Sequence, residues 1–221
     1  MAQKHALIAG ATGLVGNEVL QQLIHGRQYH TISVLSRHEV ETNSKRVETI
    51  IVNYDQLKDE DLPEADDVFC CLGTTMDKAG SKAAFRKVDY DYPLRIAEIT
   101  HRRGAQQYLL VSAMGADKNS YFFYNQVKGE VEEAIASVGL ETLHIFRPSM
   151  LLGERTETRI GEQIGQVMMQ GVAPLMVGGL KKYQAIPAAT VAEAMVHAAK
   201  KELKGAYIFE SDKIQALAQY A

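Results

Sequence analysis

The chain has 221 residues, 46% of them hydrophobic and 23% charged, which is the composition of an ordinary globular protein that can bury a core as one domain. Its formal net charge of -3 gives no electrostatic reason to expect a nucleic-acid partner. No apolar run approaches the roughly 20 residues that cross a bilayer. The two adjacent cysteines, Cys70 and Cys71, would point to opposite faces of a strand and form no disulfide. We therefore expect a cytoplasmic protein that binds neither nucleic acid nor membrane.

Short apolar runs alternate with amphipathic stretches along the chain. Strands are predicted at 5–9, 31–35, 47–52, 67–71, 108–111, 142–146 and 206–209. These runs are almost continuously apolar, as expected of parallel strands that are buried on both faces. Helices are predicted at 15–24, at 85–99 with a kink or restart at Pro93, at 126–138 and at 188–200. The alternation predicts an α/β fold over residues 1–221, a single Rossmann-type, doubly wound parallel sheet with helices on both faces.

A glycine-rich turn, Gly10-x-x-Gly13-x-x-Gly16, joins the first strand to the first helix. Such glycines alone are consistent with a plain strand-to-helix turn. Directly after an N-terminal strand, however, they favour a dinucleotide site. There the backbone approaches the pyrophosphate closely and the helix amides face its negative charge.

The end of the second predicted strand indicates which dinucleotide fits. An acidic side chain at this place would bind the ribose 2′-hydroxyl of NAD. This chain has Ser36 and Arg37 instead, and the arginine offers a permanently charged fork that suits a 2′-phosphate, although it could also be a solvated surface residue. After the third strand, Asp55 could accept from the adenine amino group or simply cap the next turn. We expect NADP(H) as the cofactor.

Tyr124 and Lys128 have the Y-x-x-x-K spacing, which puts both side chains on one face of a helix. An adjacent ammonium favours the phenolate, so we expect it to lower the tyrosine pKa from about 10. Ser112 follows a predicted core strand at the edge where α/β sheets bind ligands. The alternative is that Ser112 caps the strand and Tyr124 belongs to an aromatic cluster. With the glycine motif present, we interpret Ser112, Tyr124 and Lys128 as catalytic.

This combination resembles the atypical and extended branches of the short-chain dehydrogenase/reductase superfamily. Further segments are similar to the Tat-interacting-protein oxidoreductases, namely 70–75, 78–80, 88–89, 115–118, 126–130 and 146–148. The resemblance implies that Gly73 and Thr74 lie near the nicotinamide ribose of NADP(H) and that Lys128 bonds to that ribose. It also implies that the loop after Pro148 contacts the carboxamide. The predicted cofactor contacts are Gly10, Thr12, Gly13, Leu14, Val15, Gly16, Ser36, Arg37, Asp55, Leu72, Gly73, Thr74, Tyr124, Lys128 and Pro148.

The sequence also departs from the family pattern. The active-site asparagine of ordinary members has no clear equivalent, and Asp89 lies in the corresponding helix. His38 stands where the relatives tend to carry a second arginine, which would weaken the hold on a 2′-phosphate. The seven histidines are scattered without zinc-ligand spacing, so no metal site is expected.

The sequence favours an NADPH-dependent reductase that acts on a carbonyl or similar group of a small molecule, as a monomer or homodimer. Glycines between 149 and 185 predict a small substrate lid in this segment. One alternative is a non-catalytic NADPH-binding regulator that reports redox state to a protein partner. Another is a nucleotide-sugar epimerase or dehydratase of the extended branch, which is less favoured because few residues follow Arg147.

Overall fold

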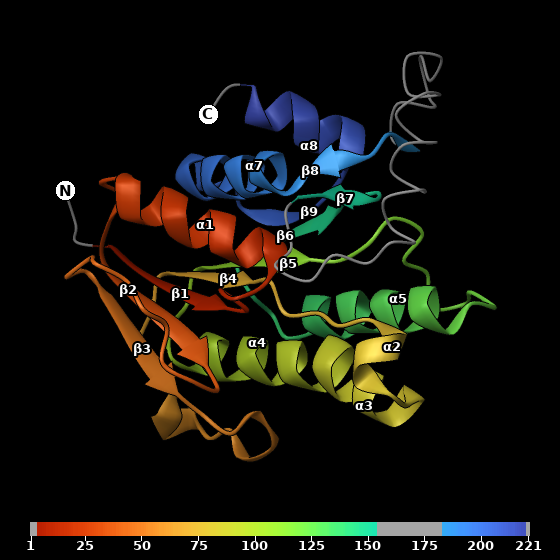
Figure 1. Cartoon of the computed structure of the whole chain (residues 1–221), viewed down its shortest axis with the longest axis horizontal. Helices are drawn as coiled ribbons and strands as arrows, with labels where there is room; N and C mark the ends of the chain where they lie inside the picture. The colour runs from red at the N-terminus through yellow and green to blue at the C-terminus, as the bar shows by residue number, and fades with distance from the viewer. Residues whose placement is uncertain (1–3, 154–182, 220–221) are drawn as a thin grey trace.

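A computed structural model describes residues 4–153 and 183–219. In this part of the chain a parallel sheet has the strand order β3-β2-β1-β4-β5-β6-β9 (Figure 1). The chain runs outward from β1 to β3, then crosses to the other side of β1 and continues with β4, so the direction of winding reverses between β1 and β4. The strands are β1 (Lys4–Ala9), β2 (Tyr29–Ser36), β3 (Val47–Ile51), β4 (Asp67–Cys70), β5 (Gln107–Val111), β6 (Thr142–Arg147) and β9 (Gly205–Glu210).

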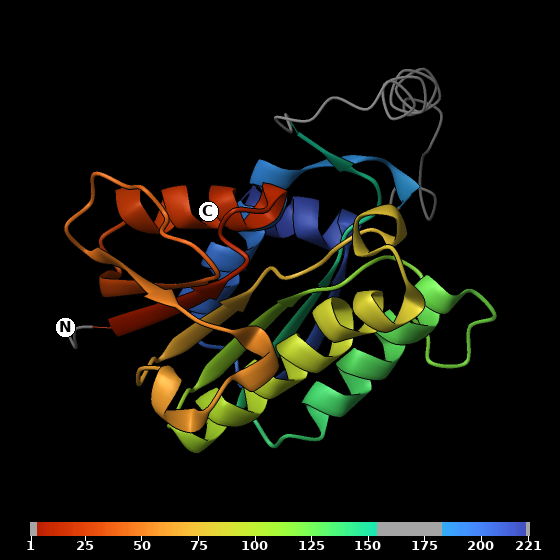
Figure 2. The same cartoon turned by 60° about the horizontal axis from the view of Figure 1, so that its bottom comes forward.

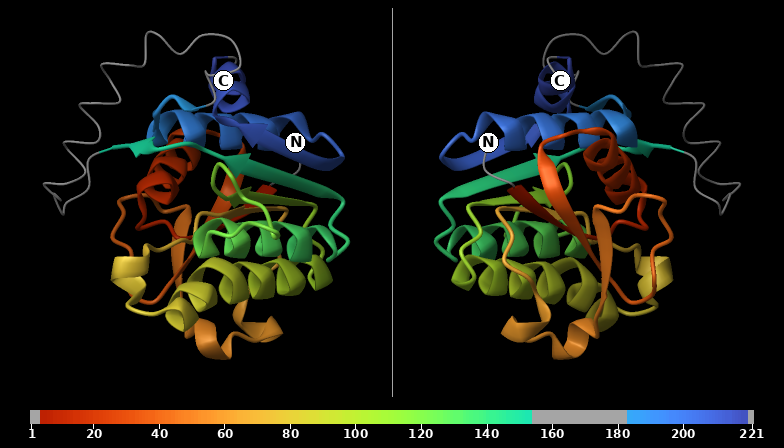
Figure 3. Two further views of the ribbon diagram at one scale, coloured as in Figure 1. Left: turned by 90° about the vertical axis from the view of Figure 1, so that its right-hand side faces the viewer. Right: turned by 90° about the vertical axis from the view of Figure 1, so that its left-hand side faces the viewer.

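Helices cover both faces of this sheet. Figure 3 shows α1, α7 and α8 on one side and α4 and α5 on the other. The predicted doubly wound α/β fold is therefore confirmed. No helix in the described ranges is long and apolar enough to cross a membrane. The helices are α1 (Leu14–His25), α2 (Met76–Ala79), α3 (Lys82–Arg86), α4 (Tyr92–Arg102), α5 (Phe123–Ala136), α7 (Ala188–Lys201) and α8 (Ser211–Ala218).

The central strand β1 shows why the predicted strands are apolar without alternation. Ala6 and Ile8 are fully buried in the core that contains residues of α1 and α7. Leu7 and Ala9 point the other way and are fully buried in the core under α4 and α5. Because successive side chains of a strand face opposite sides, a sheet with two helical layers needs apolar residues at every position.

The backbone stays helical from Lys82 to Arg102, but the type of helix changes before Pro93. Helix α4 begins at Tyr92 with Pro93 in its first turn, so the predicted restart takes the form of this change of helix type. A π-helical segment, Lys87–Asp91, joins α3 to α4 and was not predicted. Such a segment is a local widening of the helix that occurs frequently at functional sites. It contains Asp89, whose exposed fraction is 1%.

The predicted lid at 149–185 falls mostly on residues 154–182, which lie outside the described residues. At its two borders, β7 (Leu151–Leu152) pairs in parallel with β8 (Ile186–Pro187). Gly153 follows β7 and lies against Leu14, since a side-chain carbon at this glycine would come within 2.5 Å of Leu14 Cδ1. The segment after β6 therefore reaches back to the glycine-rich turn.

Candidate functional site

The glycine-rich turn connects the carboxyl end of β1 to α1. Gly10 has a φ of +88°, and a side-chain carbon there would lie 2.6 Å from the carbonyl oxygen of Cys71. A side-chain carbon at Gly16 would lie 2.1 Å from the carbonyl oxygen of Gly10. Both positions therefore require glycine, the first for the turn and the second for the close packing of α1 against the strand end.

The first turn of α1 leaves backbone amides available to an anion. Gly13 caps this helix without a side-chain hydrogen bond, and the first turn contains no acidic residue. Thr12 and Gly13 are exposed, while Val15 is buried in the core. Unpaired amides and the positive end of the helix dipole attract phosphate groups. The cradle thus fits the pyrophosphate of a dinucleotide.

The ends of β2 and β3 hold the residues expected near the adenosine. Arg37 is exposed and forms no ion pair with any residue that the structure describes, and the Ser36 hydroxyl accepts from the His38 amide at 3.3 Å. One carboxylate oxygen of Asp55 accepts from Lys87 Nζ and from the Tyr92 hydroxyl, both at 2.9 Å. These two bonds, with Lys87 the stronger influence, lower the pKa of Asp55.

The alternative role of Asp55 as a turn cap is wrong. The residue that caps the short helix Tyr54–Gln56 is Asn53, whose side chain accepts from the Asp55 amide at 3.1 Å. Asp55 remains about half exposed beside Lys87. The hydrogen bonds from Lys87 and Tyr92 both use Asp55 Oδ1, so the role predicted from the sequence, to accept from an adenine amino group, would fall to Oδ2.

Helix α5 begins at the same edge of the sheet as the glycine-rich turn (Figure 2). Tyr124 and Lys128 lie in the first two turns of this helix. Tyr124 lies in its first turn with 38% of the residue exposed, and its ring packs on Phe85 at 5.6 Å between centroids. Lys128 follows one turn later and is buried, and its ammonium nitrogen lies 2.7 Å from Asp89 Oδ1. The predicted helix begins three residues earlier than expected, and this places Tyr124 within it.

The Lys128 ammonium lowers the pKa of Tyr124, as expected, but the burial of the phenol outweighs this effect. The loss of hydration around the phenol raises its pKa, the ammonium of Lys128 lowers it, and the carboxylate of Asp89 raises it again. The net pKa of Tyr124 lies above its ordinary value, so the predicted lowering is wrong. Burial alone would lower the pKa of Lys128, but Asp89 and Tyr124 together hold it above its ordinary value.

The loop after β4 completes this part of the site. The Thr74 amide donates to Asp89 Oδ2 at 2.9 Å. A side-chain carbon at Gly73 would lie 3.5 Å from Asp89 Oδ1 and 3.9 Å from Lys128 Nζ, so the loop backbone runs directly over the ion pair. Leu72 packs against the core under α4 and α5. The structure therefore brings Gly73, Thr74 and Lys128 together around a carboxylate.

Ser112 lies at the end of β5, as expected, but its hydroxyl is engaged elsewhere. It donates to Glu132, a buried residue of α5. Glu132 in turn accepts from Arg147 Nε at 3.0 Å at the end of β6. The carbonyl of Pro148, the next residue, accepts from the Met114 amide at 2.9 Å. In this structure Ser112 thus belongs to an ion-pair network that ties α5 to the ends of β5 and β6.

Two groups at this edge were not assigned a role from the sequence. The sequence places Asp89 only in the helix where ordinary members of the superfamily carry the active-site asparagine. The 39 positions that separate it from Lys128 give no sign of the ion pair. Glu132 looks like any charged residue on a helix surface. A buried carboxylate on α5 could have been suspected because its position, one turn after Lys128, continues the face that meets the sheet.

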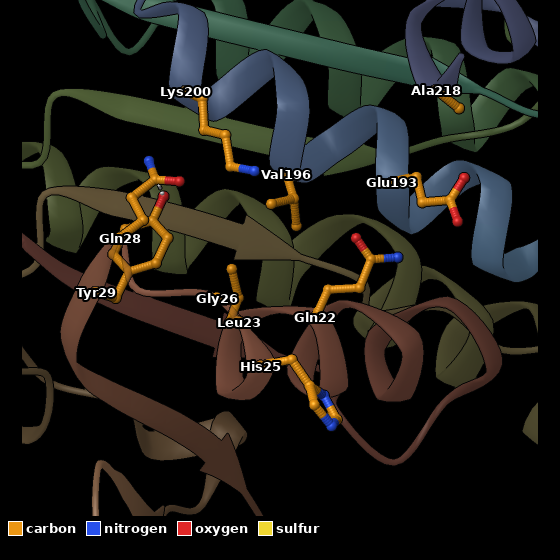
Figure 4. Close-up of a pocket in the computed structure, with 10 residues that line it drawn as sticks. All are labelled: Gln22, Leu23, His25, Gly26, Gln28, Tyr29, Glu193, Val196, Lys200 and Ala218. Carbon is orange, nitrogen blue, oxygen red and sulfur yellow. Dashed lines mark hydrogen bonds between the residues drawn. The ribbon is translucent and has the colours of Figure 1, made fainter. Parts of the chain in front are cut away.

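A pocket of about 530 Å³ lies elsewhere, between the end of α1 and α7 (Figure 4). Its lining mixes apolar Leu23 and Val196 with Gln22, Glu193 and Lys200. It opens at the amino end of β2, whereas parallel α/β sheets bind ligands at the carboxyl ends of their strands. The candidate site is therefore the opposite edge, at the glycine-rich turn. The described residues contain no group of three or more potential metal ligands.

Comparison with known proteins agrees with this geometry. The profile of a family described as NAD(P)H-binding matches residues 10–202. The chain belongs to this NAD(P)H-binding family. Protein HTATIP2 of Rattus norvegicus is 35% identical over 203 residues, which cover 89% of this chain and 81% of that protein. A mitochondrial fmp52 protein of Aspergillus niger is 31% identical over 218 residues, covering 94% and 92% of the two chains. The family resemblance predicted from the sequence is confirmed.

Solved structures share the fold at low sequence identity. The Bordetella bronchiseptica enzyme WbmH in complex with NAD+ has a TM-score of 0.71 at 13% identity, covering 98% of this chain and 80% of that one. The human epimerase family protein SDR39U1 with NADPH has a TM-score of 0.60 at 18% identity, covering 94% and 74%. Both show that this arrangement of strands and helices is found in proteins that bind NAD or NADPH. The family match and the shared fold together identify the chain as an NAD(P)H-binding protein.

Proposed function

We propose that this chain is an NADPH-dependent oxidoreductase that reduces a carbonyl or similar group on a small molecule. The observation that carries the proposal is the position of the Tyr124 phenol and the buried Lys128 ammonium on one helix face, where Lys128 lies beside the loop after β4. When bound, the nicotinamide supplies the hydride. The protein has to bind and orient both partners and deliver a proton.

The preference for NADPH rests on the end of β2. Arg37 is exposed there with its guanidinium unengaged by any described carboxylate, and Ser36 adds a hydroxyl. A planar guanidinium can make two charge-assisted hydrogen bonds with a phosphate, whereas a free ribose hydroxyl offers it no charge.

The proton is assigned to Tyr124. Because the pKa of this phenol lies above its ordinary value, the hydroxyl is protonated at neutral pH. That is the form which can donate to a substrate oxygen as hydride arrives, so it supports reduction over oxidation. Lys128, one turn below, would bond the nicotinamide ribose and stabilise the phenolate that remains after the transfer.

The proposed role of Ser112 carries a condition. A serine hydroxyl has one proton to donate, and here that proton goes to Glu132. To hold and polarise a substrate oxygen, Ser112 would have to release Glu132, whose charge Arg147 already balances. We place proton delivery on Tyr124, and substrate orientation on Ser112 once its hydroxyl has turned from Glu132 to the substrate.

Turnover of a panel of aldehydes, ketones and quinones by the protein with NADPH tests the proposal. We expect oxidation of NADPH that depends on one class of carbonyl substrate and that is lost in Tyr124→Phe. Tight binding of NADPH without turnover of any carbonyl would instead favour the non-catalytic regulator. The absence of NADPH binding would contradict both interpretations.

A further inference from the structure

The carboxylate of Asp89 joins two parts of the site that are far apart in the sequence. Its Oδ2 accepts from the Thr74 amide at 2.9 Å, which fixes the loop after β4. Its Oδ1 lies 2.7 Å from Lys128 Nζ, which fixes the ammonium that α5 presents. The exposed fractions of the two charged side chains are 1% and 5%, so water does not replace either contact.

A buried ion pair is an inefficient way to stabilise a fold. The loss of hydration of both charges offsets most of their attraction, and an apolar pair of similar volume is frequently as stable. The π-helical segment adds a further irregularity, because it carries more residues per turn than the α-helices on either side of it and so changes the direction in which Asp89 points. The buried ion pair and the π-helical segment both involve Asp89, and neither is an efficient way to stabilise the fold. Their coincidence at this residue favours a functional role for Asp89.

We propose that Asp89 is a positioning residue, whose single carboxylate fixes the Gly73–Thr74 loop and the Lys128 ammonium relative to each other where the nicotinamide ribose would bind. The assignment of the ribose to this place rests on the proposed function. The two contacts of Asp89 are properties of the protein alone. Their role can therefore be tested without any cofactor.

The charge of Asp89 also decides the protonation state of Lys128. The ionisable groups that face this ammonium are Asp89 from the π-helical segment, Tyr124 from α5 and Cys70 from β4. Burial alone would lower the pKa of Lys128, and Asp89 contributes most to holding it above its ordinary value. Without the carboxylate, burial would dominate and the pKa would fall.

Two substitutions separate the two contacts. Asp89→Asn keeps a carbonyl oxygen that can accept from the Thr74 amide, but its NH₂ group cannot pair with an ammonium. Asp89→Ala removes both contacts. Glu130→Gln is the matched control, because it also removes one negative charge close to Lys128 in the sequence. Glu130 lies on α5 two positions after Lys128, and its carboxylate pairs with Arg86 rather than with Lys128.

The titration of Lys128 in the cofactor-free protein is the decisive measurement. Carbon-13 NMR of protein labelled at the lysine Cε gives its pKa, with the signal identified by its absence in Lys128→Met. We expect a wild-type value above the ordinary value of about 10.4, a fall below that ordinary value in Asp89→Asn because burial then dominates, and little change in Glu130→Gln. Hydrogen exchange of the Thr74 amide should accelerate at least tenfold in Asp89→Ala and much less in Asp89→Asn.

Calorimetric titration with NADPH then connects the contacts to the ribose. Affinity should fall about tenfold or more in Asp89→Asn and further in Asp89→Ala, with Glu130→Gln unchanged. Equal shifts of the Lys128 pKa in Asp89→Asn and Glu130→Gln would overturn the inference. If Asp89→Asn does not fold, a wild-type Lys128 that titrates below the ordinary lysine value would overturn it as well. Failure of the wild type to bind NADPH would refute the proposed function but leave the Lys128 titration interpretable.

Discussion

Tyr124 shows how burial, with a smaller contribution from Asp89, can reverse a pKa shift expected from one helix. Considered with Lys128 alone, its phenol would ionise more easily than usual. The protein packs it against Phe85, and Asp89 balances the ammonium below it. The phenol therefore keeps its proton at neutral pH, as a general acid requires.

Replacement of this hydroxyl is the most direct residue-scale prediction. Tyr124→Phe keeps the ring on Phe85 but removes the proton, so kcat for an authentic substrate should fall by about 10²–10⁴-fold. The affinity for NADPH should barely change, because the ring adds no charge to the site. Steady-state kinetics and calorimetric titration of the same preparation measure the two effects. Full activity of Tyr124→Phe would show that another group delivers the proton.

Arg37 provides a second residue-scale prediction. Arg37→Ala should weaken NADPH binding by roughly 1.5–3 kcal/mol, the range of a charge-assisted contact, which is about 10- to 150-fold in Kd. NADH binding should hardly change, because NADH lacks the 2′-phosphate. Arg27→Ala at the opposite edge removes the same charge and serves as the control. Calorimetry with both cofactors decides, and equal losses for NADPH and NADH would contradict the assignment.

At the scale of elements, two of the ion pairs that α5 forms differ in character. Glu132 is buried and pairs with Arg147, whose side chain is 21% exposed. Glu130 pairs with Arg86, whose side chain is 40% exposed. Since the two carboxylates are two positions apart on one helix, they allow a comparison in which helix propensity is constant.

Glu132→Gln should lower the free energy of unfolding by roughly 2–3 kcal/mol, somewhat less than for a fully buried pair, because Arg147 loses its partner but keeps some hydration. Glu130→Gln should cost at most about 1 kcal/mol, as partly exposed pairs do. Urea denaturation of both variants measures the difference. Equal losses would mean that the network around Ser112 does not anchor α5.

The elements themselves could largely be predicted from the sequence. The seven apolar runs correspond to the strands of the sheet. In inner strands such as β1, β4 and β6, burial on both faces leaves a signal at every position, whereas the edge strands β3 and β9 are partly or largely exposed. Pro93 marked the restart of a helix because it cannot donate a backbone hydrogen bond. The π-helical segment was not predicted, and the partners of Asp89 within it are a loop and a helix that are distant in sequence.

The candidate site was predictable to a similar extent. The glycines, Tyr124 and Lys128 have fixed local spacings, so their positions follow from the motif. The partner of Ser112 does not, because Glu132 lies 20 positions further along the chain and reaches the hydroxyl only after α5 packs on the sheet. Side-chain pairing between elements is a property of the packed molecule, and a single sequence gives little information about it.

On the scale of the whole molecule, stability should depend on pH through His144. Its ring is fully buried on β6 and lies edge-on to Tyr207 and Phe209, and burial lowers its pKa to about 4. In the unfolded chain the ring regains an ordinary value near 6.5, so the unfolded state binds the proton more readily. The contribution is fully present above pH 6.5 and is lost as the pH falls towards 4.

The loss over this interval should be about 3 kcal/mol. His144→Phe, which keeps an aromatic ring in the core, should remove this part of the acid sensitivity. His30→Asn at an exposed position should keep it. Denaturant unfolding at several pH values measures the slope for each protein, and an unchanged slope in His144→Phe would mean that other groups cause the acid sensitivity.

The packing of α7 on α1 has a consequence for the way the protein is made. Helix α7 begins 163 residues after α1 ends, yet the two share one apolar core with β1. At a synthesis rate of about 5–20 residues per second, the ribosome needs roughly 8–33 s to supply the covering helix. During this time the apolar face of α1 has no native partner from α7. We therefore expect the nascent chain to depend on chaperones until its last quarter emerges.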